Sequence, residues 1–527
     1  MIENKYNLLD ENWIPVVGVG KVGLKRIFSD SSLSALGGNP IEKIAVFKLL
    51  LAIAQTACTP KDEDEWKSLG RSGMQEKVLE YLDSHRDCFW LYGEKPFLQV
   101  PEIADEAHCS DKKKFAPVQI GNGKFPDLYA DNNTVVSEYD YLDITNKTAE
   151  LALFLITVQN FALRGKQVNN KIKLADEMPP KSIIANPGPS LGFNKFLHSF
   201  ILLDSILGSI YLNLFSMEDL DASGIVTSLG IPFWEKMPKS ENDEIAKNSK
   251  DTLLGHLIPM SRFVYFTESG IFFTEGITYH LSKEEKKKNK DFVSWKEFSI
   301  SWKLDEKNEM KYLSADVSKR PWRLLTSLLV KNLEAEYQNL GIRIALKKLL
   351  SVNDCDSFII WSGGLDVGGD SFGMKIKENN DYVESELLLQ KSIFSTSEGF
   401  SFFKNISNVM AKMNNCEGKL EYSVSSYFME LQNKKLTDGK ARKSIIDDRL
   451  GIPKQEFWQL CEGEFQNVID ICSGDNAEEN LKPVLKKIRS FVSQIYDETC
   501  PKDTARQMEA WAKNKPFMKK SKIEEER

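Results

Sequence analysis

The sequence predicts an α+β protein, in which a large mixed N-terminal domain over residues 1–380 precedes a C-terminal four-helix bundle over residues 385–515. Up to about residue 380, alternating strand-like segments are mixed with apolar helical ones. Beyond residue 385, proline is scarce and apolar residues recur at spacings of three and four. The length of 527 residues also exceeds the usual size of one compact domain. We therefore expect two domains.

The mixed domain contains two segments that favour buried helices and one that favours a strand. Residues 41–57 are apolar on most faces, and Asn39-Pro40-Ile41-Glu42 supplies a cap, a first-turn proline and a capping-box acid. Residues 148–163 have the same apolar character. Residues 294–302 alternate between apolar and polar side chains, which is typical of a half-buried strand.

The second domain has the periodicity of packed helices. Phe400, Phe403, Ile406 and Met410 are spaced by three or four residues, and later segments continue this pattern. Short breaks between these segments predict four or five antiparallel helices. The tail, residues 516–527, is low in complexity, and we expect it to fray.

Composition limits the possible functions. A net charge of −7 argues against a free-standing protein that coats nucleic acid, but it allows basic loops on an acidic body. The eight cysteines include no C-x-x-C pair, so a zinc or other metal site has little support and a reducing compartment is favoured. Neither a signal peptide nor an apolar run of membrane-spanning length is evident. We expect a cytoplasmic protein without a membrane partner.

Three stretches resemble one protein family. They are Asn7-Leu8-Leu9-Asp10-Glu11-Asn12-Trp13-Ile14-Pro15-Val16, then Leu49-Leu50-Leu51-Ala52-Ile53-Ala54-Gln55 with Pro60-Lys61-Asp62 behind it, and Phe89-Trp90-Leu91-Tyr92-Gly93-Glu94-Lys95-Pro96-Phe97-Leu98-Gln99. Their order and spacing resemble CasA, the large subunit of the type I-E CRISPR Cascade complex. Weaker similarity continues around Gly255 and Gly363-Gly364.

The resemblance implies a subunit of an RNA-guided complex that recognises a short protospacer-adjacent motif (PAM) in double-stranded DNA. It implies that the subunit starts strand separation, helps to hold the displaced strand and recruits a helicase-nuclease. Base pairing with the guide RNA would supply the long-range specificity. The implied partners are guide RNA, duplex target DNA, other Cascade subunits and a helicase-nuclease, and no cofactor is implied.

Two basic segments correspond to the family's PAM-reading loops. The family uses a glycine-rich loop after a buried helix, and the matching residues here are Arg164, Gly165 and Lys166, with a single glycine left. The alternative is a solvated helix end on which basic residues are favoured by the helix dipole. The family also inserts a lysine into the minor groove, and the candidates are Lys286, Lys287, Lys288 and Lys290. A solvated charged loop is the alternative.

The resemblance also implies a wedge between the first base pairs. The family places a glutamine there after a Gly-Gly turn, whereas Gly363-Gly364 leads here to Ser371, Phe372, Gly373 and Met374 without a glutamine. Phe372 or Met374 could unstack a base step as an apolar wedge. The alternative is an ordinary hairpin with Phe372 packed inward.

Two further regions are candidates for nucleic-acid contacts. Lys124 and Phe125 lie in a loop that the family directs towards guide RNA and neighbouring subunits. In the bundle, Lys482, Lys486 and Arg489 share one helical face that could follow the displaced strand, although a solvated face is the alternative.

The sequence offers no catalytic residues. The five histidines are dispersed, and no phosphate-binding loop or nucleophile elbow is present. A binding protein is therefore favoured over an enzyme. A structural scaffold of a variant Cascade, without its own PAM reading, remains the alternative because the loop has one glycine and the wedge glutamine is missing.

Overall fold

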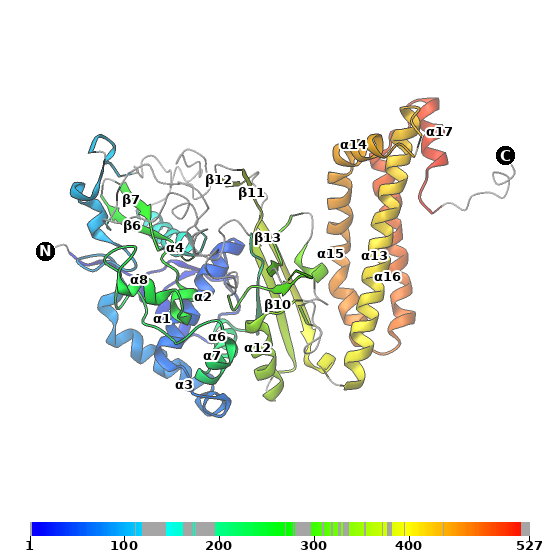
Figure 1. Ribbon diagram of the computed structural model, residues 1–527. Helices are drawn as coiled ribbons and strands as arrows, with labels where there is room; N and C mark the ends of the chain where they lie inside the picture. The colour runs from blue at the N-terminus through cyan, green and yellow to red at the C-terminus, as the bar shows by residue number, and fades with distance from the viewer. Residues whose placement is uncertain are drawn as a thin grey trace. The chain divides into compact units, whose positions relative to one another are not determined.

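The computed structural model describes most of the chain. The described residues are 3–110, 112–117, 144–161, 172, 174, 195–268, 270–277, 279, 297–307, 310–317, 320–324, 328–329, 337–352, 355–370, 373–376, 382–394, 396–435 and 437–517. Two compact units are present. The first comprises Met1–Val317 and Glu336–Glu386, and the second comprises Ser318–Ala335 and Leu387–Arg527. The predicted α+β class is confirmed, with small sheets in the first unit and packed helices in the second (Figure 1).

The first unit is built around helix α2 (Pro40–Cys58). The predicted capping box is confirmed, because Asn39 Oδ1 accepts from the Glu42 amide at 3.0 Å and Glu42 Oε2 accepts from the Asn39 amide at 2.9 Å. Helices α3 (Glu63–Ser84) and α4 (Ile144–Phe161) pack against α2. Nearly every side chain of α2 is buried as a result, as its apolar composition predicted.

A three-stranded antiparallel sheet has the strand order β13-β10-β5. Its strands are β5 (His198–Leu202), β10 (Ser357–Leu365) and β13 (Tyr382–Gln390). The register pairs Ile359 with Leu202 and Gly363 with His198. Helix α2 packs against β10, so the sheet and the central helix share one core.

The remaining strands form two-stranded hairpins and ladders. These are β1 (Lys5–Asn7) with β4 (Trp90–Tyr92), β2 (Ile14–Val16) with β3 (Gly20–Val22), β6 (Arg262–Thr267) with β7 (Gly270–Glu275), β8 (Trp302–Leu304) with β9 (Met310–Tyr312), and β11 (Val367–Asp370) with β12 (Gly373–Ile376).

Short helices are also present among the described residues of the first unit. They are α1 (Leu24–Ser29), α6 (Ile206–Asn213), α7 (Met217–Ser223), α8 (Glu244–Ser249), α9 (Leu253–Leu257) and α12 (Leu340–Ser351), with 3-10 turns at Arg86–Phe89, Pro101–Ala104, Glu106–His108 and Lys112–Lys114.

The strand predicted over residues 294–302 is largely wrong. Within its described part, Ile300 forms only an isolated bridge with His198, and the strand β8 begins at Trp302. The polar side chains of Glu297, Ser299 and Ser301 are buried together with Phe298 and Ile300. Polar and apolar positions are therefore buried alike, so the alternation does not distinguish a solvent-facing side from a core-facing side. For this reason the sequence pattern predicted a half-buried strand wrongly.

The second unit contains three long helices among its described residues, α13 (Thr396–Leu431), α15 (Gly451–Ser473) and α16 (Ala477–Thr499), and each of them packs against the other two. The shorter α14 (Gly439–Arg449) and α17 (Ala505–Lys513) pack on α13 near one end of the bundle (Figure 1). Two 3-10 turns, Pro321–Leu324 and Lys391–Phe394, belong to the same unit.

The row of buried side chains on α13 is rotated slightly about the helix axis from the predicted row. Phe402 and Val409 are buried, whereas Phe403 and Met410 are only half-buried. Ile406 is buried as predicted. Within the described residues, no helix combines the length and the apolar character that a bilayer crossing needs.

Candidate nucleic-acid interface

Most residues of the predicted interface lie outside the described residues. This holds for Lys124, Phe125, Arg164, Gly165, Lys166, Lys286, Lys287, Lys288, Lys290, Ser371 and Phe372. For Gly373 and Met374 the structure gives the strand β12. Lys482, Lys486 and Arg489 are fully described on α16. The structure therefore informs on the predicted loops through the residues that begin and end them.

The basic face of α16 is exposed along its length. Lys482, Lys486 and Arg489 are all exposed, while Val484 and Ile488 point into the bundle. Lys482 pairs with Glu479 on the same helix, with 2.5 Å between Nζ and Oε2. Lys486 and Arg489 form no ion pair among the described residues.

Strands β11 and β12 pair as an antiparallel ladder, in which Asp370 lies opposite Gly373. Ser371 and Phe372 of the predicted wedge lie outside the described residues. The structure therefore gives the two strands on either side of the predicted wedge.

Asp366 directly precedes β11 and is held by two contacts. Its carboxylate forms an ion pair with Lys195, the first described residue after 175–194. The second oxygen of Asp366 accepts from the Val317 amide at 3.2 Å. Asp366 thus holds the start of β11 against Lys195 and Val317. The segment that contains Arg164, Gly165 and Lys166 ends earlier, at Ile172, whose carbonyl accepts from the Thr274 hydroxyl at 2.9 Å.

The beginning of that segment is held by the end of α4. The side-chain amide of Gln159 donates to the Arg262 carbonyl at 2.8 Å and accepts from the Arg262 amide at 3.1 Å. Two residues later, the ring of Phe161 lies 5.6 Å from the ring of His198. All three side chains are buried, so the chain leaves the core at a fixed place.

The lysine-rich segment is held at both ends. Before it, the Tyr279 hydroxyl accepts from the Met260 amide at 2.8 Å, and the Ile277 amide donates to the Met260 carbonyl at 2.7 Å. After it, the first described residue is Glu297, which is 2 % exposed. Burying a carboxylate is costly unless it is paired and hydrogen-bonded.

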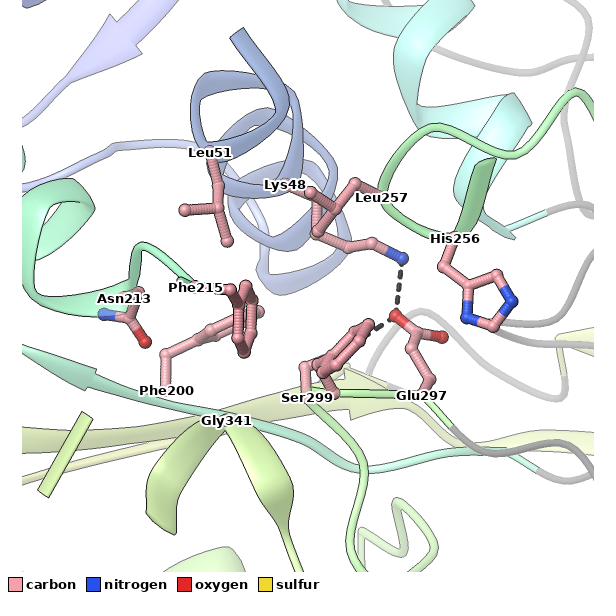
Figure 2. Close-up of a pocket in the computed structure, with 11 residues that line it drawn as sticks. Lys48, Leu51, Phe200, Asn213, Phe215, His256, Leu257, Glu297, Ser299 and Gly341 are labelled. Atoms are coloured by element: carbon pink, nitrogen blue, oxygen red, sulfur yellow. Dashed lines mark hydrogen bonds and ion pairs between the residues drawn. The ribbon is translucent and has the colours of Figure 1, made fainter. Parts of the chain in front are cut away.

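Glu297 is paired with Lys48 inside the core. Figure 2 shows the Lys48 side chain reaching from α2 to the carboxylate, and the distance from Nζ to Oε1 is 2.5 Å. Lys48 is 1 % exposed. A cavity of about 10 Å³ beside the pair is lined by Asn213, His256 and Ser299, among others, and has room for a single water molecule. We call Lys48 and Glu297 the buried pair.

A hydrogen-bonded chain extends from the buried pair to the sheet. The Ser299 hydroxyl donates to Glu297 Oε1 at 3.1 Å, and it lies 2.8 Å from His198 Nδ1. Because a hydroxyl has only one proton to donate, His198 must donate from Nδ1 to Ser299. His198 is also the residue in contact with Phe161. The ends of the two predicted PAM-reading segments therefore meet in one buried polar network.

Electrostatics favours the ionised form of the carboxylate in this network. Burial alone would raise the pKa of Glu297, but the positive charge of Lys48 and the neighbouring His198 lower it to about 2. Burial lowers the pKa of the Lys48 ammonium, and Glu297 opposes that shift. We treat both groups as charged, since their atoms are in direct contact and the carboxylate has a second donor in Ser299.

His256 lies next to the buried pair and gives stability a pH dependence. Burial lowers its pKa from 6.5 to about 4, although Glu297 and a hydrogen bond to the Lys250 carbonyl at 2.8 Å favour the protonated ring. Between these two values the unfolded chain binds a proton that the folded chain does not, so stability falls as the pH decreases from 6.5 to 4.

We expect titration of His256 to lower the free energy of unfolding by about 3 kcal/mol at the acidic end of the range from pH 6.5 to 4. Urea unfolding of the wild-type chain and of His256→Gln at pH 7, 5.5 and 4 measures it. The glutamine keeps a donor for the Lys250 carbonyl but cannot titrate, so the difference between the two chains isolates the imidazole. A variant that loses stability as steeply as the wild type would show that another group is responsible.

The buried pair was missed by sequence reasoning, although one signal was available. Lys48 is a lone charged residue in the middle of an apolar helix, and a lysine is rarely buried unless it is paired. Its partner lies 249 positions away, and no local pattern identifies it. Among the described residues, no group of three or more histidine, cysteine, aspartate or glutamate side chains is arranged to hold a metal ion.

Comparison with known proteins places the chain among the CRISPR-associated proteins. The family model of CRISPR-associated protein Cse1 matches residues 7–495. The chain therefore belongs to the Cse1 family, also named CasA, which is the family of the large subunit of type I-E Cascade. The family resemblance seen in the first hundred residues is confirmed.

A curated relative, CRISPR-associated protein CasA/Cse1 of Thermus thermophilus, is 27 % identical over 216 residues, which are 38 % of this chain and 40 % of the relative. The match thus spans less than half of that protein. Solved structures share the fold more widely. Thermus thermophilus CasA (Cse1) has a TM-score of 0.65 at 16 % identity, with 97 % of this chain and 98 % of that chain covered. Thermobifida fusca Cse1 has a TM-score of 0.66 at 14 % identity, with 97 % of each chain covered.

Proposed function

We propose that this chain is the large subunit of an RNA-guided Cascade complex, in which it recognises the PAM in double-stranded DNA and starts strand separation for guide pairing. The observation that carries the proposal is the meeting of loop ends in the first unit. The segment with Arg164 to Lys166 begins, and the segment with Lys286 to Lys290 ends, at one buried network that includes His198, Ser299, Glu297 and Lys48.

This arrangement suits a protein that recognises a short sequence in duplex DNA. A loop that enters the minor groove and a wedge that unstacks the adjacent base step must act within a few base pairs of each other. Loops anchored in a shared rigid core keep that spacing, whereas loops on separate surfaces would not. An acidic body still allows binding, since these segments supply local basic charge at the place of contact.

The partners follow from the family. One structure of the same fold is titled CRISPR RNA-guided surveillance complex, with a TM-score of 0.62, 12 % identity, and 97 % of this chain and 99 % of that chain covered. We propose that the chain assembles in the cytoplasm with guide RNA and other Cascade subunits, with Lys124 and Phe125 facing them. The exposed face of Lys486 and Arg489 on α16 would follow the displaced strand, and a separate helicase-nuclease would perform the cleavage. The chain itself would bind without catalysing a reaction.

Replacing Phe372 by alanine tests the wedge. We expect the assembled complex to lose about 10- to 100-fold in affinity for duplex targets with a functional PAM, because unstacking a base step costs a few kcal/mol that the ring would no longer compensate. A target with the first base pairs already unpaired should bind as in the wild type. Binding of both substrates by electrophoretic mobility shift, with libraries of randomised PAMs, measures the effect.

Phe517→Ala is the matched control, because it removes an exposed phenylalanine from the second unit. An equal loss on duplex and unpaired targets would show that Phe372 only supports general binding. If neither Phe372→Ala nor a Gly165 variant changed duplex recognition, the scaffold function without PAM reading would be favoured instead.

A further inference from the structure

A second cavity in the first unit is not used by the proposed DNA interface. It has a volume of about 150 Å³ and lies between α2, α6 and the strands β5 and β10. Its apolar lining is formed mainly by Phe47, Phe200, Leu202, Ile206, Ile359 and Trp361. An apolar cavity of this volume can accept a group as large as a benzene ring.

The walls of the cavity are preformed. The rings of Phe47 and Phe200 lie 4.7 Å apart, and those of Phe200 and Trp361 lie 6.1 Å apart. Trp361 donates from Nε1 to Glu384 Oε1 at 2.6 Å, and Lys43 Nζ contacts the same oxygen at 2.6 Å. The indole orientation is therefore fixed, and the charge of Lys43 is already balanced by Glu384.

The rim of the cavity is negative. Asp204 and Glu386 line it and are exposed, and neither has an ion-pair partner among the described residues. With Lys43 neutralised, two carboxylates remain beside an apolar opening. A phosphate backbone would be repelled here, whereas an apolar group with a neighbouring cation would be complementary in both shape and charge.

We propose that this cavity is a docking site for a neighbouring protein chain of the same complex, which inserts one leucine, methionine or phenylalanine side chain. A lysine or arginine next to the inserted residue would pair with Asp204 or Glu386. The inserted side chain is the buried anchor, and the charge pair at the rim sets its orientation, as at other interfaces with a central apolar anchor. This site rests on the proposed function only for the choice of complex, not for PAM reading.

Photo-crosslinking on the assembled complex tests the site. A benzophenone amino acid is introduced in place of Leu36, which lines the cavity and is half-buried, and in a second chain in place of the exposed Ser34. After irradiation without target DNA, we expect both positions to crosslink to one protein subunit. The crosslinked peptide should carry an apolar residue within about one helical turn, or ~4 residues, of a lysine or arginine.

Charge reversal gives the second measurement. Asp204→Lys combined with Glu386→Lys should lower the crosslinked fraction by about tenfold, because like charges now face each other. Glu76→Lys with Glu80→Lys is the matched control, since both are exposed carboxylates on α3, away from the cavity lining, and it should change the fraction less than twofold.

Crosslinks to guide RNA, crosslinks to a second copy of this chain, or no crosslink at all would each overturn the proposal. An equal effect of the two charge reversals would do the same. Because no target DNA is present, a chain that fails in PAM recognition would still crosslink. Failure of the docking site and failure of the proposed function are therefore separate results.

Discussion

Replacing Glu297 by alanine is expected to lower the free energy of unfolding of the first unit by about 3 to 5 kcal/mol. The substitution removes the carboxylate that pairs with the buried Lys48 ammonium, and it also removes the acceptor of the Ser299 hydroxyl. Removing the ion-pair partner of a charge that is 1 % exposed costs far more than the lost side-chain contacts. Hydrogen exchange of the α2 amides, which report on opening of this unit, measures the change.

Removing both charges should restore most of that loss. Lys48→Met combined with Glu297→Leu replaces the buried pair by apolar side chains of similar size, an exchange that is often neutral in protein cores. The matched surface control is Glu479→Ala, which breaks a pair with Lys482 whose side chains are 67 % and 73 % exposed, and it should cost less than about 1 kcal/mol. A Glu297→Ala chain as stable as the Glu479→Ala chain would contradict the assignment of Lys48 and Glu297 as a charged pair.

The same experiment bears on the proposed interface. Glu297 is the first described residue after the lysine-rich segment, and His198, at the far end of the network, contacts the end of α4. Loss of the buried pair should therefore weaken duplex recognition beyond what the lower stability explains. The Lys48→Met, Glu297→Leu chain separates the two effects, because its stability is restored while the polar anchor of the segment is not.

The sequence was most informative where structure depends on neighbours along the chain. The capping box at Asn39 and Glu42 uses four consecutive residues, and it is formed as expected. The helical bundle was predictable for the same reason, because spacings of three and four residues define a face wherever the helix later packs. The α13 stripe was misplaced by a small rotation, since Phe402 and Phe403 are both apolar and only packing decides which one is buried.

Contacts between distant positions could not be predicted. Trp322 lies about seventy residues before the first bundle helix, yet its ring packs 4.2 Å from Phe465 and 5.8 Å from Trp458 in the second unit. Nothing in the local sequence indicates which core an isolated tryptophan joins. The buried pair has the same character, because Lys48 is conspicuous in its helix while Glu297 resembles any other acid in a charged stretch.

The candidate interface was predictable only as a set of segments. A family resemblance assigns a role to a segment, but a run such as Lys286, Lys287, Lys288 and Lys290 has no internal pattern that selects one side chain. The structure adds the relation that sequence could not give, namely that segments more than a hundred residues apart start or end in the same network. That relation supports the lysine run as a candidate PAM-reading segment more strongly than its charge alone does.

Replacing all four of these lysines by glutamine should produce the largest change in DNA binding. If two to four of them contact phosphates, the slope of log affinity against log salt for duplex DNA becomes shallower by about 1.8 to 3.6. At 0.1 M salt each lost contact corresponds to about 0.9 of a decade, so affinity should fall by about 10² to 10⁴-fold. Titrations of the assembled complex with a PAM-containing duplex at several salt concentrations measure both quantities.

The comparison with α16 decides where the lost contacts were made. Lys486→Gln with Arg489→Gln removes two exposed charges from the bundle and should weaken only targets that carry a displaced strand. The variant with all four lysines replaced should instead bind an intact PAM duplex more weakly. This holds even for a duplex too short to be unwound, because the lost contacts form before strand separation. If the lysine variant kept the wild-type salt slope on that short duplex, the segment would be a solvated loop, and PAM recognition would have to come from Arg164 to Lys166 or from elsewhere in the complex.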